Sequence, residues 1–313
     1  ALTAEPKRVS PAVALLRHGR HNLRQFLTIE EHGRVRLLPK LFQSSPATMR
    51  YTAAEHDAFA SDFNRDSLVV LKNHFPRDKL GRWREAFQPL LEAQMQIDRD
   101  DPNRGAQRFY VTLPFQGLFA DPQIYEDADV LAIVERVAGP DPVLCQLATD
   151  TPLRGSDYQK WHADTPPLFP ETRSNDTPSF QIAVNFALCD VGDDNGPFET
   201  THGTHRMNRQ DAVDGIASGA IPCHRYLMAM GDVMIRDVRA VHRGTPNSTD
   251  EPRPMVVLGY SRRWLHRPEV QIRVPQSSWD RLSPTGKRLL RFNPVVPDDQ
   301  VATPTESYRA FAY

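Results

Sequence analysis

The sequence predicts a mainly β fold, an antiparallel barrel or jelly roll, with a layer of helices contributed by the N-terminal part of the chain. Amphipathic helical patterns precede Pro140, whereas short β-rich runs separated by turn residues follow it. We expect one domain with three parts: a mostly helical support layer over 1–140, a β core over 141–265 and an irregular, proline-marked wrapping segment over 266–313. With 40% hydrophobic residues, the 313-residue chain can bury a substantial core.

The helical layer begins at a capping signal. Thr52 is followed three residues later by a glutamate, which is the capping-box spacing and predicts a helix start. A short apolar strand is expected within 67–75, and a second helix over 76–95. A third helix over 126–138 would end at Gly139. The apolar face of the second helix consists of Leu80, Trp83, Phe87, Leu90 and Leu91.

The β core is predicted from runs rich in β-branched and aromatic residues. Clusters of Gly, Pro, Asn and Asp separate these runs, which indicates loops between strands. One of these loops is a proline-rich stretch at 165–178. The expected strands lie in "PVLCQLAT" (142–149), "SFQIAVNFALCD" (179–190), "RYLMAMGDVMIRD" (225–237) and "PMVVLGYSRRW" (254–264).

Charge and composition exclude several classes of partner. The formal net charge of −1 gives no general attraction to nucleic acid or to an anionic membrane, so we expect a small molecule. No apolar run approaches the roughly 20 residues that a membrane span requires. The basic stretch at 11–27 has helical spacing and reads as a docking helix or, less favoured, an organelle transit sequence. Three separated cysteines read as small buried residues in a reducing compartment, so we expect a cytoplasmic protein.

Candidate metal ligands occur in "YQKWHADTPPLF" (158–169). Side chains two residues apart on a strand point to the same face, so His162 and Asp164 can offer an imidazole and a carboxylate to one point. His242, which follows another predicted strand, supplies a third ligand. Two histidines and one carboxylate leave coordination positions open, as in non-haem iron(II) oxygenases. Structural zinc is the alternative, but it prefers four protein ligands, commonly with cysteine, and no cysteine is near these residues in sequence.

Arg253 fits the same hypothesis. It enters the strand after a polar hairpin, where its planar guanidinium could bind the far carboxylate of a 2-oxo acid whose other end chelates the metal. Such a charge-assisted pair contributes roughly 1.5 to 3 kcal/mol, and lysine would match the carboxylate less well.

Five motifs together resemble one known family. The order of an HxD pair, an NGP segment with a glycine loop ending in histidine, a GD-strand, a histidine and an arginine 11 residues later is similar to the phytanoyl-CoA dioxygenase family of iron(II)/2-oxoglutarate oxygenases. The segment "DFNRDSLVVLKNHF" (62–75) also resembles that family, so the similarity covers roughly residues 55 to 265. The motifs are "WHAD" (161–164), "NGPFETTHGTHR" (195–206), "GDV" (231–233), "VHRG" (241–244) and "EPRP" (251–254).

The resemblance implies a double-stranded β-helix in which His162, Asp164 and His242 bind Fe(II) and Arg253 binds 2-oxoglutarate. It also implies that dioxygen is reduced with release of succinate and CO2 while a substrate C–H bond is hydroxylated or otherwise oxidised. Thr245 could provide a hydroxyl contact to the cosubstrate. Halogenating relatives lack the carboxylate of the HxD pair, so Asp164 indicates oxygenation.

Four residues are candidates for substrate contact. Phe109 and Tyr110 could line a pocket from the helical layer, and Phe169 could contact substrate from the 165–178 loop. Arg239, in a cluster with Arg236 and Arg243, could contact an anionic substrate, although such clusters are usually solvated.

Three functional hypotheses follow from these residues. The first is oxidation of a small organic molecule, in specialised metabolism. The second keeps the chemistry but takes a CoA- or carrier-protein-tethered acyl substrate. The third is a non-catalytic metal-binding barrel that acts as a sensor or scaffold.

Overall fold

A computed structural model describes residues 28–29, 35–36, 49–172, 175–265 and 271–300. The chain divides into two units, 1–46 and 47–313. In the first unit, strand β1 (Thr28–Ile29) pairs antiparallel with β2 (Val35–Arg36). The helix predicted for 11–27 lies outside the described residues. All elements discussed below belong to the second unit.

The helical layer forms as its capping and apolar patterns predict. Helix α1 (Ala53–Asp66) starts with a complete capping box: the Glu55 amide donates to the Thr52 hydroxyl at 3.3 Å, and the Thr52 amide donates to the Glu55 carboxylate at 2.7 Å. The layer continues in chain order with β3 (Leu68–Leu71), α2 (Arg77–Ile97), β4 (Arg108–Thr112), η1 (Gly117–Ala120), α3 (Pro122–Tyr125) and α4 (Ala128–Ala138). The predicted apolar face of α2 is buried except for Leu90, which is half-buried.

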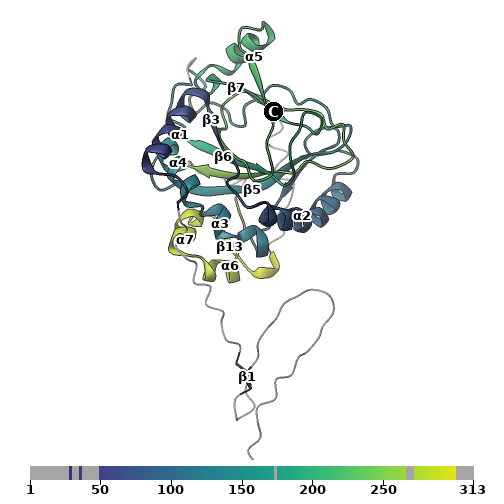
Figure 1. Ribbon diagram of the computed structural model, residues 1–313, viewed down its shortest axis with the longest axis vertical. Helices are drawn as coiled ribbons and strands as arrows, with labels where there is room; N and C mark the ends of the chain where they lie inside the picture. Colours follow the sequence, from purple (N-terminus) through teal and green to yellow (C-terminus); the bar gives the residue numbers. More distant parts are fainter. Residues whose placement is uncertain (1–27, 30–34, 37–48, 173–174, 266–270, 301–313) are drawn as a thin grey trace, which may run out of the picture. The chain divides into compact units, whose positions relative to one another are not determined.

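Two antiparallel sheets form the β core (Figure 1). The larger has six strands in the order β3-β9-β6-β11-β5-β4, and the smaller has the order β10-β7-β8. Successive neighbours in the larger sheet come from distant parts of the chain, so the sheet joins the N-terminal layer to the later strands. The remaining strands are β5 (Val143–Pro152), β6 (Gln181–Ala187), β7 (Phe198–Thr201), β8 (Cys223–Tyr226), β9 (Val233–Asp237), β10 (His242–Gly244) and β11 (Met255–Ser261).

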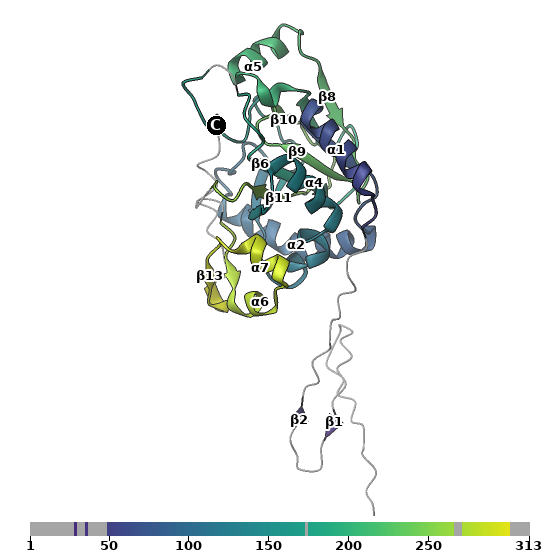
Figure 2. The same cartoon turned by 90° about the vertical axis from the view of Figure 1, so that its left-hand side faces the viewer.

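Strand periodicity separates the two faces of the six-stranded sheet. In β6, Ile182, Val184 and Phe186 are buried in the main hydrophobic core together with side chains of α1, α2 and α4. Gln181 and Asn185 alternate with them and line a cavity on the opposite face. Figure 2 shows α1, α4 and α2 together on one side of the strands. One face of the sheet therefore packs into the hydrophobic core, and the other face lines the cavity.

The C-terminal segment is more regular than the sequence analysis expects. It contains α6 (Gln276–Arg281) and α7 (Pro284–Leu290), and β12 (Val274–Pro275) pairs in parallel with β13 (Val295–Val296) ahead of η4 (Asp298–Gln300). The prolines that suggested irregular chain precede or begin these helices, where a missing amide proton costs nothing. The prediction of irregular wrapping was therefore wrong for these residues.

Two further features concern the surface. Of the cysteines, Cys145 is buried as predicted, Cys189 is half-buried, and Cys223 is exposed because it lies on β8 at the edge of the smaller sheet. Within the described ranges, we find no helix of the length and apolar character that crossing a bilayer would require.

Helix α5 (Arg209–Ala217) and η2 (Thr204–Arg206) connect β7 to β8.

Candidate active site

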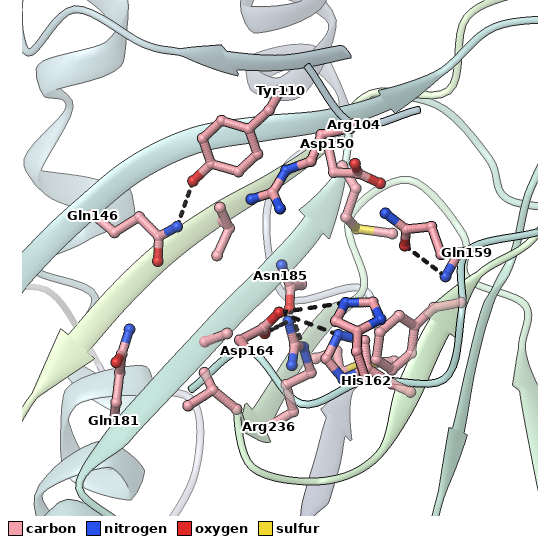
Figure 3. Close-up of a pocket in the computed structure, with 18 of the residues that line it drawn as sticks. Arg104, Tyr110, Gln146, Asp150, Gln159, His162, Asp164, Gln181, Asn185 and Arg236 are labelled. Carbon is pink, nitrogen blue, oxygen red and sulfur yellow. Dashed lines mark hydrogen bonds and ion pairs between the residues drawn. The ribbon is translucent and has the colours of Figure 1, made fainter. Parts of the chain in front are cut away.

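His162, Asp164 and His242 converge at one end of the cavity (Figure 3). His162 and His242 exchange main-chain hydrogen bonds of 3.0 and 2.9 Å, which bring the segment before the proline-rich loop alongside β10. The Nε2 atoms of His162 and His242 lie 3.7 and 3.4 Å from Oδ1 of Asp164. Two imidazole nitrogens and one carboxylate oxygen therefore surround a single point.

Backbone carbonyls fix the orientation of both imidazole rings. Nδ1 of His162 donates to the Lys160 carbonyl at 2.8 Å, and Nδ1 of His242 donates to the Ala240 carbonyl at 2.9 Å. Because a carbonyl only accepts, Nδ1 carries the proton in each neutral ring and Nε2 keeps its lone pair. Burial, together with the neighbouring His242, lowers the pKa of His162 to about 4, so this ring is neutral at physiological pH. Both rings are thus prepared to bind a metal through Nε2.

The Asp164 carboxylate is held by an arginine on its other oxygen. Arg236 donates from Nη2 to Oδ2 of Asp164 at 2.8 Å and from Nε to the Asn185 amide oxygen at 3.0 Å. Burial would raise the pKa of Asp164, but His242 and Arg236 hold it well below the usual value. The carboxylate is therefore ionised, and Oδ1 faces the two histidines.

This donor set fits iron(II). The three donor atoms lie within 4.8 Å of one another, and all three residues line a cavity of about 110 Å³. Two histidines and one carboxylate leave room for further ligands from the cavity, whereas a closed zinc site would surround the ion with four protein ligands.

A second group of possible ligands, His74, Asp127 and Asp129, is used for structure. The Asp127 side chain accepts from the Val130 amide and lies 2.9 Å from Nε2 of His74. Asp129 lies 2.8 Å from Nε2 of His56 and accepts from two main-chain amides. Asp127 caps α4 and Asp129 ties α4 to the start of α1, so both carboxylates are used within the fold.

Arg253 lines the same cavity and is almost fully buried, with 3% of its surface exposed. Its Nη2 donates to the Gly196 carbonyl at 2.6 Å, while its Nε has no hydrogen-bond partner among the described residues. Burial lowers the pKa of Arg253 to about 10, which leaves it charged at neutral pH. A buried, charged guanidinium with an unused donor fits a ligand carboxylate at this end of the cavity.

The other predicted contact residues divide between cavity and core. Tyr110 lines the cavity, but its neighbour Phe109 points into the main hydrophobic core, since adjacent residues of β4 face opposite sides of the sheet. Phe169 is 52% exposed and is not among the cavity-lining residues. The Thr245 hydroxyl donates to the Pro197 carbonyl at 2.7 Å, and Thr245 does not line the cavity either.

Arg239 does not line the cavity that His162, Asp164 and His242 share. It is buried at 3% exposure and pairs with Asp237, which is fully buried, at 2.8 Å. It also donates to Thr177 and Asn175 in the loop after the HxD pair. Arg236 lines the cavity instead, because it lies three residues earlier on β9 and faces the inner side of the sheet.

We therefore predict that Arg239→Ala destabilises the fold. Removing one member of a buried ion pair leaves the other charge uncompensated, which costs about 3–5 kcal/mol. Urea unfolding measures this loss directly. Arg154→Ala is the matched control, because Arg154 and its partner Asp250 are both exposed and such pairs contribute about 0–1 kcal/mol. An Arg239→Ala variant as stable as wild type would contradict the structural role.

Several cavity residues were missed by the sequence analysis. Gln146 and Asp150 on β5 line the cavity, as do Gln181 and Asn185 on β6. In each strand the polar side chains alternate with buried apolar ones. Polar residues four positions apart on one face of an otherwise apolar central strand, with a small alanine between them, were the signal that could have identified this face.

Comparisons with known proteins agree with this architecture. A model of the family described as Phytanoyl-CoA dioxygenase (PhyH) matches residues 63–255, more than half of the chain. Epimerase SnoN, solved in complex with Fe3+, alpha ketoglutarate and nogalamycin RO, is 20% identical, with 80% of this chain and 98% of SnoN covered and a TM-score of 0.52. AviO1 from Streptomyces viridochromogenes Tue57 is 19% identical, with 70% and 99% covered and a TM-score of 0.52.

A third structure, the non-heme alpha ketoglutarate dependent carbocyclase SnoK from nogalamycin biosynthesis, is 15% identical, with 69% of this chain and 88% of SnoK covered and a TM-score of 0.50. Identities this low establish a shared fold, which confirms the predicted jelly-roll class. The family match adds the sequence relation, and it spans the HxD pair and the distal histidine and arginine. The chain therefore belongs to the phytanoyl-CoA dioxygenase (PhyH) family of non-haem iron(II)/2-oxoglutarate-dependent oxygenases.

Proposed function

We propose that this oxygenase oxidises a C–H bond of a small organic molecule at iron(II) bound by His162, Asp164 and His242, with 2-oxoglutarate anchored by Arg253. The observation that supports it most is the convergence of both Nε2 atoms on Asp164 Oδ1 beside a buried arginine with an unused donor. Iron(II) and 2-oxoglutarate, when bound, supply the chemistry that reduces dioxygen and releases succinate and CO2. The protein residues would bind and orient the metal and the cosubstrate and would partly neutralise their charges.

Each residue has a separate task in this proposal. His162 and His242 present neutral nitrogens whose direction is set by the Lys160 and Ala240 carbonyls. Asp164 offers one oxygen and compensates part of the metal charge, while Arg236 keeps its second oxygen occupied. Because Arg236 occupies its second oxygen, Asp164 would offer the metal one oxygen, and a set of two histidines and one carboxylate would leave room for 2-oxoglutarate and dioxygen.

The cosubstrate carboxylate would lie against Arg253. Among the described residues, this guanidinium has one hydrogen bond, to the Gly196 carbonyl, so a ligand carboxylate would give the unpartnered Nε an acceptor. Asp150 lies near enough to Arg253 and Arg108 that these cations lower its pKa, although burial alone would raise it. Asp150 therefore stays ionised and prevents excess positive charge at this end.

The apolar part of the cavity surrounds the position where substrate would approach. Ala183, Val238 and Val257 line it alongside the polar residues described above. Mixed linings of this type bind small organic molecules through apolar contact and orient them with a few polar groups. SnoN and SnoK are both described as enzymes of nogalamycin biosynthesis, and we extend that setting, specialised metabolism, to this chain.

The test is succinate release from 2-oxoglutarate in the presence of iron(II) and oxygen, screened over small natural-product scaffolds and over acyl-CoA thioesters. A small molecule that stimulates succinate release and gains oxygen supports the proposal. Stimulation by thioesters alone would favour the tethered-substrate hypothesis, and tight zinc binding without any 2-oxoglutarate affinity would favour a sensor.

A further inference from the structure

One cation at the cavity is left without an acidic partner. Arg236 pairs with Asp164 at 2.8 Å, and Arg108, directly behind the cavity wall, pairs with Asp150 at 2.9 Å. Arg253 is reserved for the cosubstrate in the proposed function. Arg104 also lines the cavity, yet it makes no hydrogen bond or ion pair with any residue in the described part of the chain. Its five N–H donors are available to a ligand.

The position of Arg104 is built by its neighbours. The preceding residue, Asn103, is locked to β4: its amide nitrogen donates to the Tyr110 carbonyl at 2.9 Å, and its amide oxygen accepts from the Tyr110 amide at 2.8 Å. The Arg104 guanidinium carbon then lies 4.6 Å from the centre of the Tyr110 ring. The Tyr110 hydroxyl is hydrogen-bonded to Gln146 on β5, which fixes the ring. These contacts therefore hold the Arg104 guanidinium in a defined position against the Tyr110 ring.

Figure 3 shows Arg104 in the same part of the cavity as Tyr110 and Asp150, with the Asp164 and His162 side chains farther along. Asp150 lies close enough to Arg104 for the two charges to interact, but its carboxylate accepts its hydrogen bond from Arg108. Four arginines thus meet only two carboxylates around this cavity, before any metal is counted. Iron(II) adds two positive charges and 2-oxoglutarate adds two negative ones, so the loaded site stays positive.

We propose that Arg104 binds an anionic group of the primary substrate, a carboxylate or a phosphate ester, and so orients the substrate between Tyr110 and the metal. This inference rests on the proposed function, since it concerns the same cavity. A guanidinium bonds planar and tetrahedral oxyanions through paired N–H donors, and a partly desolvated site strengthens that bond. The face of the Tyr110 ring holds the Arg104 guanidinium in place, and the N–H donors at the edge of the guanidinium stay available to the substrate.

The alternative is that Arg104 only stacks on Tyr110 and offsets Asp150 through space. In that case a neutral ligand would bind as well as a charged one, and replacing Arg104 would change affinity for both equally. The two cases are therefore separated by ligands that have the same shape but a different charge.

The experiment uses the full chain loaded with iron(II) and saturating 2-oxoglutarate without oxygen, so that Arg253 is occupied. The probes are aliphatic and aromatic carboxylic acids, each paired with its primary amide, and phenyl phosphate paired with its neutral dimethyl ester. Calorimetry measures their affinity for wild type, Arg104→Gln, Arg104→Lys and the exposed control Arg154→Gln. In wild type and the control, the anion should bind about tenfold or more tightly than its neutral partner.

In Arg104→Gln that preference should disappear, and in Arg104→Lys it should be partly retained. Carboxylate-only or phosphate-only preference identifies which oxyanion the site takes. Equal weakness of every anion and its neutral partner in wild type overturns the inference, as does an anion preference that persists in Arg104→Gln. The visible band of iron-chelated 2-oxoglutarate is recorded for each sample. Absence of this band in wild type refutes the proposed function. Presence of the band together with an anion preference that does not depend on Arg104 refutes this inference alone.

Discussion

Replacing Asp164 with asparagine should abolish succinate formation and weaken iron(II) binding. The substitution keeps the shape of the side chain and an oxygen for Arg236, so the fold and the hydrogen bond from Nη2 can persist. It removes the only anionic ligand of the three residues that converge on the site. Loss of partners that merely orient metal ligands costs about 10- to 100-fold, so losing the ligand charge itself should cost on the order of 100-fold or more.

Iron affinity is measured by anaerobic titration of the metal-free protein, and succinate is measured under oxygen. Asp250→Asn is the matched control, because it makes the same chemical change at an exposed carboxylate paired with Arg154. The control should match wild type in both assays. Normal turnover in Asp164→Asn would exclude the proposed iron ligation.

Replacing Arg253 with glutamine should raise the concentration of 2-oxoglutarate required for turnover. A hydrogen bond between charged groups contributes about 1.5–3 kcal/mol, which corresponds to roughly 10- to 150-fold in affinity. Arg253→Lys keeps the charge but loses the planar pair of donors, so it should fall between wild type and Arg253→Gln. Iron affinity should change little, because Arg253 is not one of the converging ligands.

Calorimetric titration of 2-oxoglutarate into the iron-loaded variants gives the affinities, and KM for 2-oxoglutarate gives an independent value. Arg154→Gln serves as the control for removal of an arginine charge away from the cavity. Unchanged 2-oxoglutarate affinity in Arg253→Gln would place the cosubstrate elsewhere.

Much of the fold could be predicted because local signals and tertiary structure agree. The capping box at Thr52, the apolar face of α2 and the Gly139 stop all appear where the sequence indicates. The C-terminal helices could not be predicted well because α6 and α7 are short, with six and seven residues. Helices of that length are stabilised by packing, here by residues such as Leu289, and periodicity over so few residues is weak.

The metal ligands could be predicted because spacing and motif order both pointed to them, whereas the cavity wall could not. Whether Phe109 or Tyr110 faces the cavity depends on the register of β4 against β5, which a single strand does not reveal. Arg236 and Arg239 present the same difficulty. Arg236 lines the cavity from β9, whereas Arg239 lies just after β9 and pairs with Asp237. Arg104 lies outside the predicted strands, and its place at the cavity depends on contacts that the sequence does not reveal, those of Asn103 and of the Arg104 guanidinium with Tyr110.

The central claim, that this chain holds iron(II) and 2-oxoglutarate together, is tested most directly by one titration. Metal-free protein is titrated without oxygen, first with iron(II) and then with 2-oxoglutarate, while the visible absorption is recorded. We expect a charge-transfer band from the chelated keto acid to appear in wild type and to weaken in Arg253→Gln. Firm binding of zinc in place of iron, with no band on addition of 2-oxoglutarate, would contradict the account.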